Sequence, residues 1–259
     1  MSTFIRSTPS VRASLHVEEW GDGTPVVLVH GSLATAQEEW EAQRTLVAEG
    51  FRFLAPDRRG FGGSPAATGE DFLQDARDIA ELLGDGAHLV GHSYGGLGAL
   101  VAAALRPEAT LSLALLEPAT IALGQDHPAG RSLVEAVRAA WDAEDAGDRE
   151  WVVRFLKAVG SDPDEFPPEF LDAALPLVPL LRNARPMWTH DLPLGELAHA
   201  SFPKLVMSGG HSAGFDAICD ELAVRIGAAR AVAEGAGHEV QFAAPAVNEI
   251  LLGLWRSAS

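Results

Sequence analysis

Short apolar runs recur along the chain, and polar residues do not alternate within them. Five of these runs lie at 24–31, 51–57, 87–93, 111–118 and 204–210. Continuous apolar runs of this length are typical of parallel strands that are covered on both faces. A further candidate strand lies at 229–237, and residues 10–21 are predicted to form an antiparallel edge strand.

Helical patterns fill the spaces between these runs. The segment DFLQDARDIAELLG (71–84) places apolar residues at helical spacing and ends at a glycine, which is a common helix stop. Residues 94–107 are almost all apolar, so we expect a buried helix there, and residues 215–227 and 244–258 have amphipathic patterns. This repeated alternation of strand and helix predicts an α/β fold with an open, mostly parallel sheet.

One region interrupts the alternation. Residues 120–192 contain helical stretches and a proline cluster, DPDEFPPEF, but no convincing strand. A long connection in a compact domain is usually functional, and it is often a lid. We therefore predict a core domain of residues 1–119 and 193–259, with a helical cap inserted at 120–192.

A serine follows the third apolar run in the motif Gly91-His92-Ser93-Tyr94-Gly95. A strand, the pattern G-x-S-x-G and then a helix form a nucleophile elbow, a tight turn that exposes the serine hydroxyl. Glycines on both sides permit close packing around a strained backbone. The helix that starts here directs backbone N–H groups toward a developing oxyanion. The motif alone is common, but its position between a strand and a buried helix favours a catalytic serine.

Four motifs together resemble the α/β-hydrolase superfamily. They are VVLVHGS (26–32), APDRRGFGGS (55–64), GHSYGG (91–96) and GAGHEV (235–240), in the order and spacing of that family. The resemblance extends over almost the whole chain. It implies an α/β-hydrolase fold, with a mostly parallel sheet of about eight strands flanked by helices, and a helical cap.

The resemblance also implies roles for individual residues. Ser93 would be the nucleophile, His238 the general base, and the backbone N–H groups of Ser32 and Tyr94 the oxyanion hole. Histidine suits the base because its ordinary pKa lies near neutrality. His30 is expected to orient the oxyanion loop, and His92 to line the pocket.

Other histidines and the charged turn of the second motif receive a structural interpretation. The remaining histidines, His211 among them, are expected to be surface or packing residues. The turn at Asp57, Arg58 and Arg59 is expected to organise the loop beside the oxyanion strand.

The acid of the expected triad is missing from its usual place. In most relatives it follows the strand read here as KLVMSGG, where this chain has Ser212. A hydroxyl cannot balance the charge of an imidazolium, so another carboxylate is needed. Glu117, at the end of LSLALLEP, resembles the acid of certain haloalkane dehalogenases and is favoured. Asp216, which fits the first turn of a helix, and the absence of any acid are the alternatives.

Composition excludes several classes of protein. The chain of 259 residues has a net charge of −17, which argues against nucleic acid and anionic membranes as partners. Its single cysteine, Cys219, rules out an internal disulfide. No metal-binding spacing and no nucleotide-binding glycine motif occur, so no cofactor and no metal are expected. The lack of a signal-like N-terminus suggests a cytoplasmic location.

The sequence thus predicts a serine hydrolase that acts on an ester-like small molecule through an acyl-enzyme. A ligand-binding receptor on the same fold, with slow turnover or none, is an alternative. A cofactor-free oxygenase or a perhydrolase on the same fold, and cleavage of carbon–carbon bonds by the same triad, are further alternatives. Serine argues against dehalogenase and epoxide hydrolase chemistry, because those relatives use an aspartate whose ester water can hydrolyse. The sequence leaves the oligomeric state open.

Overall fold

The computed structural model describes residues 15–188 and 191–258. One seven-stranded sheet has the order β1-β3-β2-β4-β5-β6-β7. Its strands are β1 Val17–Trp20, β2 Thr24–Val29, β3 Phe51–Pro56, β4 Ala87–His92, β5 Thr110–Leu116, β6 Lys204–Ser208 and β7 Ala229–Val232. All neighbouring strands pair in parallel except β1, which pairs antiparallel with β3.

The sheet confirms the fold class and the strand positions that the apolar runs predict. Seven strands lie in the described residues, where about eight were expected. The antiparallel edge is confirmed for β1, and residues 10–14 of that prediction lie outside the described residues.

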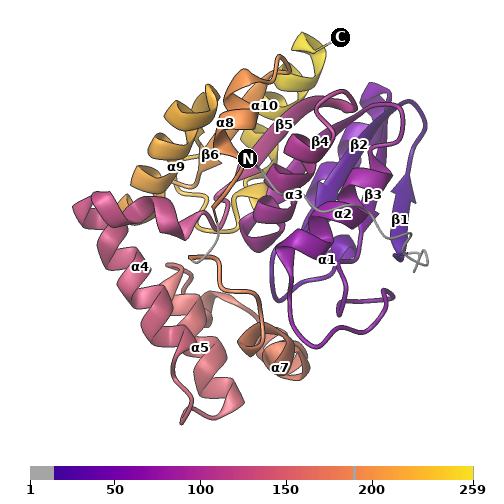
Figure 1. Cartoon of the computed structure of the whole chain (residues 1–259). Helices are drawn as coiled ribbons and strands as arrows, with labels where there is room; N and C mark the ends of the chain where they lie inside the picture. The colour runs from indigo at the N-terminus through magenta and orange to yellow at the C-terminus, as the bar shows by residue number, and fades with distance from the viewer. Residues whose placement is uncertain (1–14, 189–190, 259) are drawn as a thin grey trace, which may run out of the picture.

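Both faces of the sheet are covered, which explains the unbroken apolar runs. On β2, Val27 and Val29 pack into one hydrophobic cluster, and Val26 and Leu28 into the other. The first cluster lies under α2 (Phe72–Leu82), α3 (Ser93–Leu105), α8 (Leu194–His199) and α9 (Ala213–Ile226). The second lies under α1 (Ala36–Trp40), η1 (Glu41–Glu49) and α10 (Ala244–Ser257). Figure 1 shows these layers.

Helix α3 starts at Ser93 and is buried along most of its length. Only its last two residues, Ala104 and Leu105, escape full burial. It packs on α2, as expected for the near-continuous apolar sequence of this segment. A helix held on all sides is a rigid support for the serine at its N-terminus.

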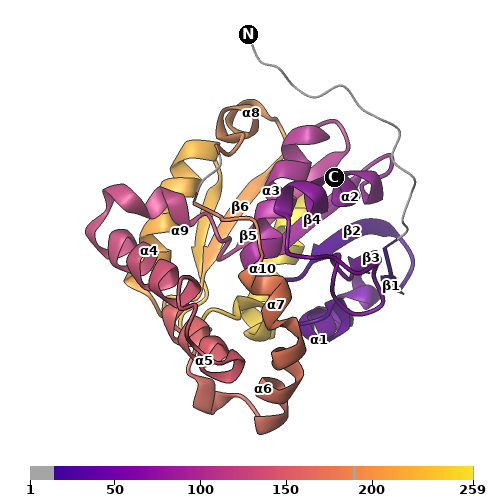
Figure 2. The same ribbon diagram turned by 60° about the horizontal axis from the view of Figure 1, so that its bottom comes forward.

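Helices alone connect β5 to β6 in residues 117–188 and 191–203. They are η2 Ile121–Asp126, α4 Pro128–Trp141, α5 Asp148–Ala158, η3 Pro163–Glu165, α6 Pro168–Ala174, η4 Leu175–Leu177, α7 Val178–Arg182 and α8. In Figures 1 and 2, α4, α5 and α7 gather at one end of the molecule, beside the sheet and its flanking helices. Stacked Trp151 and Phe155, with ring centroids 5.5 Å apart, form part of their shared core. We refer to residues 120–192 as the helical insertion.

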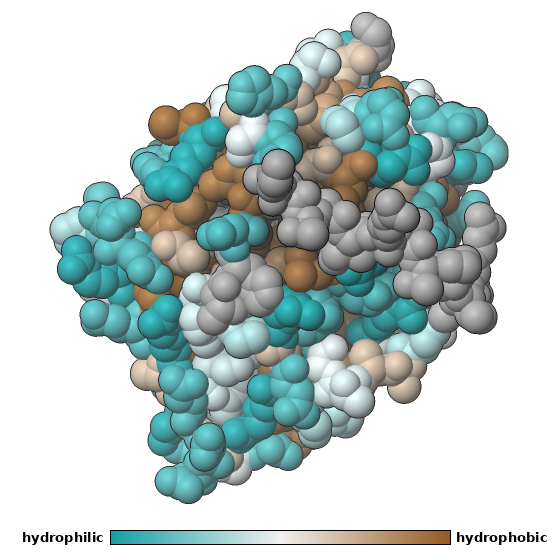
Figure 3. Space-filling model, in the orientation of Figure 1, coloured by the Kyte–Doolittle hydropathy of each residue, from teal (hydrophilic) through white to brown (hydrophobic). Residues whose placement is uncertain are grey.

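Much of the face drawn in Figure 3 is hydrophilic. On the face drawn in Figure 3, the hydrophobic residues gather mainly around α8 and α9, where Val224 is 80% exposed. The longest helices have 14 residues. Within 15–188 and 191–258, no helix combines the length and apolar character needed to cross a membrane.

Candidate active site

Ser93 lies at the turn between β4 and α3, and its backbone has a φ of +49°. A positive φ is unusual for a residue with a side chain, and such strain is concentrated at functional sites. A Cβ on Gly91 would lie 2.6 Å from the Cβ of Ala99, and a Cβ on Gly95 would lie 2.1 Å from the carbonyl oxygen of His30. Both positions therefore require glycine, as the elbow motif predicts.

Three side chains from separate segments meet at this turn. Oγ of Ser93 lies 3.0 Å from Nε2 of His238, and Nδ1 of the same ring lies 2.8 Å from Oε2 of Glu117. Ser93 follows β4, Glu117 follows β5 and His238 follows β7, so all three come from the carboxyl edge of the parallel strands. Because the carboxylate can only accept, Nδ1 carries the hydrogen and Nε2 is left to accept the serine proton. The arrangement can therefore activate the hydroxyl as a nucleophile.

Glu117 is fully buried and held from several sides. The backbone N–H of Gly209 donates to Oε1 at 2.6 Å, and the Glu117 backbone has a φ of +38°. Burial alone would raise the pKa of this carboxyl, but the imidazoles of His211 and His238 outweigh it and lower the pKa to about 2. The group is therefore a carboxylate throughout the neutral range.

Asp216, the other candidate for the acid, and Ser212, which stands at the usual place of the acid, both have other partners. Oδ1 of Asp216 accepts from Oγ of Ser208 at 2.5 Å and lies 3.4 Å from the guanidinium of Arg230. Oγ of Ser212 accepts from the backbone N–H of Phe215 and caps α9. Of the two carboxylates that the sequence offers, Glu117 is the one that lies against His238.

A buried ion pair holds the loop that contains Ser32. Oγ of Ser32 donates to Oε1 of Glu70 at 2.8 Å, and this oxygen also accepts from the guanidinium of Arg58 at 2.6 Å. The same guanidinium donates to the carbonyls of His30 and Gly31 at 2.9 and 2.8 Å. The turn at Asp57–Arg59 therefore organises the loop of residues 30–32 beside β2, as predicted, and Arg58 does so from inside the core.

His30 also has the orienting role that the sequence suggests. Its Nδ1 lies 2.7 Å from the carbonyl of Gly31, and its Nε2 accepts from the backbone N–H of Arg58 at 2.8 Å. Burial and the nearby guanidinium keep the pKa of His30 well below its ordinary value. Both nitrogens of this neutral ring make hydrogen bonds within the fold. His30 therefore has a structural role and is not the residue that transfers a proton.

The model of the alpha/beta hydrolase family matches residues 26–250. The chain belongs to this family. It is 36% identical over 187 residues to lipase LipV of Mycobacterium tuberculosis, which covers 69% of this chain and 67% of the lipase. An epoxide hydrolase of Caballeronia sordidicola is 36% identical over 103 residues, but this match covers only 37% of the chain and 31% of that protein.

Solved structures show the same fold for this family member. A carboxylesterase structure from Nitrososphaera gargenis superimposes with a TM-score of 0.70, at 19% identity and 98% coverage of both chains. The family match and the relatives named lipase and esterase identify the chain as a hydrolase enzyme.

Two small hollows flank Ser93 in this hydrolase. The outer hollow, of about 60 Å³, is lined by His238 and by aromatic residues that include Phe155, Phe166, Phe170 and Phe242. The inner hollow, of about 10 Å³, is lined by Ser32 and Tyr94 and by the apolar residues Ala119, Ile121, Val137, Trp141, Phe155, Val159, Met187 and Phe215. Among the residues that the structure describes, no lysine or arginine lines either hollow, and the outer one includes Glu39 and Glu239.

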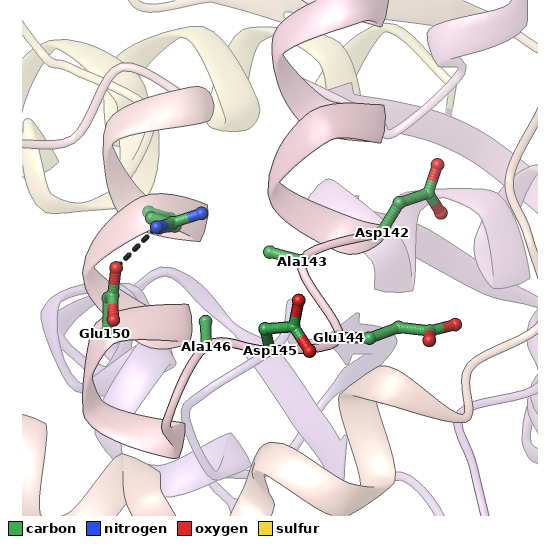
Figure 4. Close-up of a pocket in the computed structure, with 7 residues that line it drawn as sticks. Asp142, Ala143, Glu144, Asp145, Ala146 and Glu150 are labelled. Atoms are coloured by element: carbon green, nitrogen blue, oxygen red, sulfur yellow. Dashed lines mark hydrogen bonds and ion pairs between the residues drawn. The ribbon is translucent and has the colours of Figure 1, made fainter.

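A larger open hollow, of about 420 Å³, lies on the surface between α4 and α5. Its acidic lining residues, labelled in Figure 4, are Asp142, Glu144, Asp145 and Glu150, and Glu150 pairs with Arg154. It shares no lining residue with the two hollows at Ser93. The carboxylates of Asp142, Glu144 and Asp145 are exposed to solvent, and their presence in a surface loop does not indicate a ligand.

Sequence reasoning missed a second buried histidine–carboxylate pair beside the serine. Nδ1 of His92 lies 3.0 Å from Oε1 of Glu39, and Nε2 lies 3.0 Å from the carbonyl of His238. Burial lowers the pKa of His92, but Glu39 outweighs it and raises the pKa. His92 lines the outer hollow, as expected, whereas Glu39 lies in the short helix α1 and gave no signal in the sequence.

The interpretation of His211 as a surface or packing residue was wrong. Its Nδ1 lies 3.4 Å from Oε1 of Glu117, and its side chain is only 13% exposed. The chain turns after β6 so that His211, and not Ser212, faces the buried carboxylate. Its position directly before the usual site of the acid was the available signal.

Proposed function

We propose that this hydrolase cleaves carboxylic esters through an acyl-enzyme, with Ser93 as nucleophile, His238 as general base and Glu117 as the acid of the triad. The observation that carries the proposal is the continuous relay from Oγ of Ser93 through both ring nitrogens of His238 to Glu117, at 3.0 and 2.8 Å. A relay with these distances is what acyl transfer to serine requires.

In the first half of the reaction, Oγ of Ser93 attacks the ester carbonyl and its proton moves to Nε2 of His238. The backbone N–H groups of Ser32 and Tyr94 stabilise the negative oxygen of the tetrahedral intermediate. The ionised Glu117 balances the imidazolium that forms. Collapse of the intermediate expels the alcohol, which takes the proton from His238. Water then attacks the acyl group with His238 again as base.

The two hollows support an orientation for the substrate. His238 lines the outer hollow but not the inner one, and the leaving alcohol must reach His238 for its proton. The alcohol therefore occupies the outer, aromatic side, and the acyl group occupies the inner side between Ser32 and Tyr94. A volume of about 10 Å³ is close to that of one water molecule, so a short acyl group is favoured.

Serine chemistry disfavours the epoxide hydrolase alternative for this chain. Opening of an epoxide by Ser93 would give an alkyl ether, which water does not hydrolyse under these conditions. Attack on an ester gives an acyl-serine that the same histidine can help water to release. The relay also favours an enzyme over a binding protein, because a receptor gains nothing from a buried, ionised Glu117.

The test is steady-state hydrolysis of p-nitrophenyl acetate, butyrate and octanoate by the wild type and by Ser93→Ala. We expect turnover that is highest for acetate and is abolished by the substitution. Equal rates in both proteins would rule out the proposed function.

A further inference from the structure

The carboxylate of Glu117 faces two histidines, one on each oxygen. Oε2 accepts from Nδ1 of His238 at 2.8 Å. Oε1 accepts from the backbone N–H of Gly209 and lies 3.4 Å from Nδ1 of His211, the distance of an ion pair. The proposed triad acid is thus shared between His238 and a residue that plays no part in the relay.

The second ring nitrogen of His211 reaches the helical insertion. Nε2 lies 3.2 Å from the carbonyl oxygen of Val159, the residue that ends α5. A carbonyl can only accept, so Nε2 carries a hydrogen. If the ring were neutral, the lone pair on Nδ1 would face the negative carboxylate. In the imidazolium form Nε2–H donates to the Val159 carbonyl, and the positive ring lies at ion-pair distance from Glu117, although Nδ1 makes no hydrogen bond to the residues that the structure describes.

The surroundings of His211 agree with this form. The ionisable side chains that face it are Glu117 from the end of β5, and Glu239 and His238 from the loop after β7. Helix α9 contributes the uncharged ring of Phe215. Burial lowers the pKa of His211, but Glu117, the Val159 carbonyl and Glu239 outweigh it and raise the pKa.

Val159 belongs to a turn that contacts the core at two points. Gly160 has a φ of +82°, and a Cβ there would lie 2.7 Å from Nε2 of His211, so the turn fits closely over the ring. Oγ of Ser161 donates to Oε1 of Glu239 at 3.0 Å. The residues that hold the turn Val159–Ser161 are therefore neighbours of Glu117 and His238.

We propose that His211 is a positioning residue that joins the turn Val159–Ser161 to the Glu117 carboxylate and, as a cation, shares that carboxylate with His238. The inference rests on the proposed function, because it assumes that Glu117 and His238 act on Ser93. Its consequence is electrostatic. The rings of His211 and His238 have centroids 6.4 Å apart, so a cation at His211 disfavours a second positive charge on His238.

The sharpest variant is His211→Gln. The amide of glutamine reaches the former position of Nε2 and can donate to the Val159 carbonyl, but it carries no charge. The matched control is Ser161→Ala, which removes the other contact of the same turn and leaves the cation in place. Circular dichroism spectra and thermal melts would establish that both variants are folded.

The readout is the rate at which an alkyl fluorophosphonate labels Ser93 between pH 4.5 and 9. Oγ of Ser93 displaces fluoride from phosphorus while its proton moves to Nε2 of His238. In His211→Gln we expect the acid limb of this profile to move to higher pH by about 0.5–1 unit, as for loss of a like charge about 6 Å away. In Ser161→Ala we expect the acid limb to stay at the wild-type position. Superimposable wild-type and His211→Gln profiles would overturn the inference while leaving the serine hydrolase proposal intact.

A second measurement does not depend on reactivity. In ¹⁵N NMR spectra of the wild type at pH 7, both ring nitrogens of His211, assigned by their loss in His211→Gln, should be protonated. A neutral His211 ring at pH 7 would contradict the proposal. Failure of the fluorophosphonate to label wild-type Ser93 would instead remove the proposed function on which the inference is based.

Discussion

Oε2 of Glu117 lies 2.8 Å from Nδ1 of His238, a residue 121 positions later in the chain. Glu117 reaches the histidine from the end of β5, while β6 supplies only the backbone N–H of Gly209 to its other oxygen. In the triad that we propose, a glutamate at the end of one strand therefore takes the role that a residue after the next strand has in most relatives. The extra methylene of glutamate, compared with aspartate, spans the added distance.

Glu117→Gln should lower kcat for p-nitrophenyl acetate by about 10⁴-fold, as in a serine protease whose triad aspartate became asparagine. The neutral amide can hold His238 in the wrong tautomer and cannot balance the imidazolium. Asp216→Asn is the control, because Asp216 contacts Ser208 and Arg230 at the surface side of α9. We expect it to change kcat less than threefold. If the larger loss came from Asp216→Asn, Glu117 would not be the acid.

The fold and the reactive centre are predictable from this sequence for a local reason. Each sheet strand is a short apolar run, and Ser93 and His238 each sit in a glycine-containing motif within a few residues of a strand end. The structure brings both to one edge, since the carboxyl ends of parallel strands coincide there. Local sequence therefore carries most of the information about these two positions.

Residues that depend on long-range packing were harder to predict. Glu39 contacts His92 across 53 positions, and His211 contacts Val159 across 52. Nothing in the adjacent sequence marks Glu39 as buried, and the only local signal for His211 is its position directly before the usual site of the acid. The sequence left the choice of the triad acid between Glu117 and Asp216 open for the same reason. The two side chains point to different partners, and the spacing of apolar residues along the chain does not predict the direction of a side chain.

Ser32→Ala should slow turnover without weakening substrate binding. The hydroxyl of Ser32 donates to Glu70, whereas the backbone N–H that we propose as an oxyanion donor is retained. Removing an oxyanion donor costs about 10²–10³ in kcat, so loosening one should cost less, about 3–10-fold, with KM nearly unchanged. Steady-state kinetics on p-nitrophenyl acetate measures this. A rise in KM at constant kcat would instead place the hydroxyl in ground-state binding.

Glu70→Gln should destabilise the protein strongly. Arg58 and Glu70 form a fully buried pair at 2.6 Å, and breaking such a pair leaves an uncompensated charge at a cost of about 3–5 kcal/mol. Glu221→Gln, which removes a half-exposed partner of Arg225, should cost about 0–1 kcal/mol. Urea denaturation at pH 7 compares the two variants. Equal losses would indicate that Asp75, 3.0 Å from Arg58, compensates for the missing charge.

Acid should destabilise the wild type partly through Glu117. Its pKa is about 2 in the folded protein and 4.5 ordinarily, so the unfolded chain binds the proton first as the pH falls. The stability that this carboxylate contributes is therefore present above about pH 4.5 and lost progressively toward pH 2. Glu117→Gln should be less stable than the wild type at pH 7, and the difference should shrink between pH 4.5 and 3. Urea titrations at several pH values measure it, and a constant difference would argue against the low pKa.

Val137→Ala should extend the range of acyl groups that the hydrolase accepts. Val137 lines the inner hollow beside Ser93, whereas Val134, one turn earlier on α4, is equally buried but lines neither hollow. Each substitution should cost a similar free energy of unfolding, about 2 kcal/mol, because each removes two buried methyl groups. Only Val137→Ala should raise the ratio of kcat/KM for p-nitrophenyl butyrate over acetate, by about fivefold, since the space it opens is the proposed acyl site. The same rise in Val134→Ala would point to general loosening of the insertion, and no rise in Val137→Ala would place the acyl chain in the outer hollow.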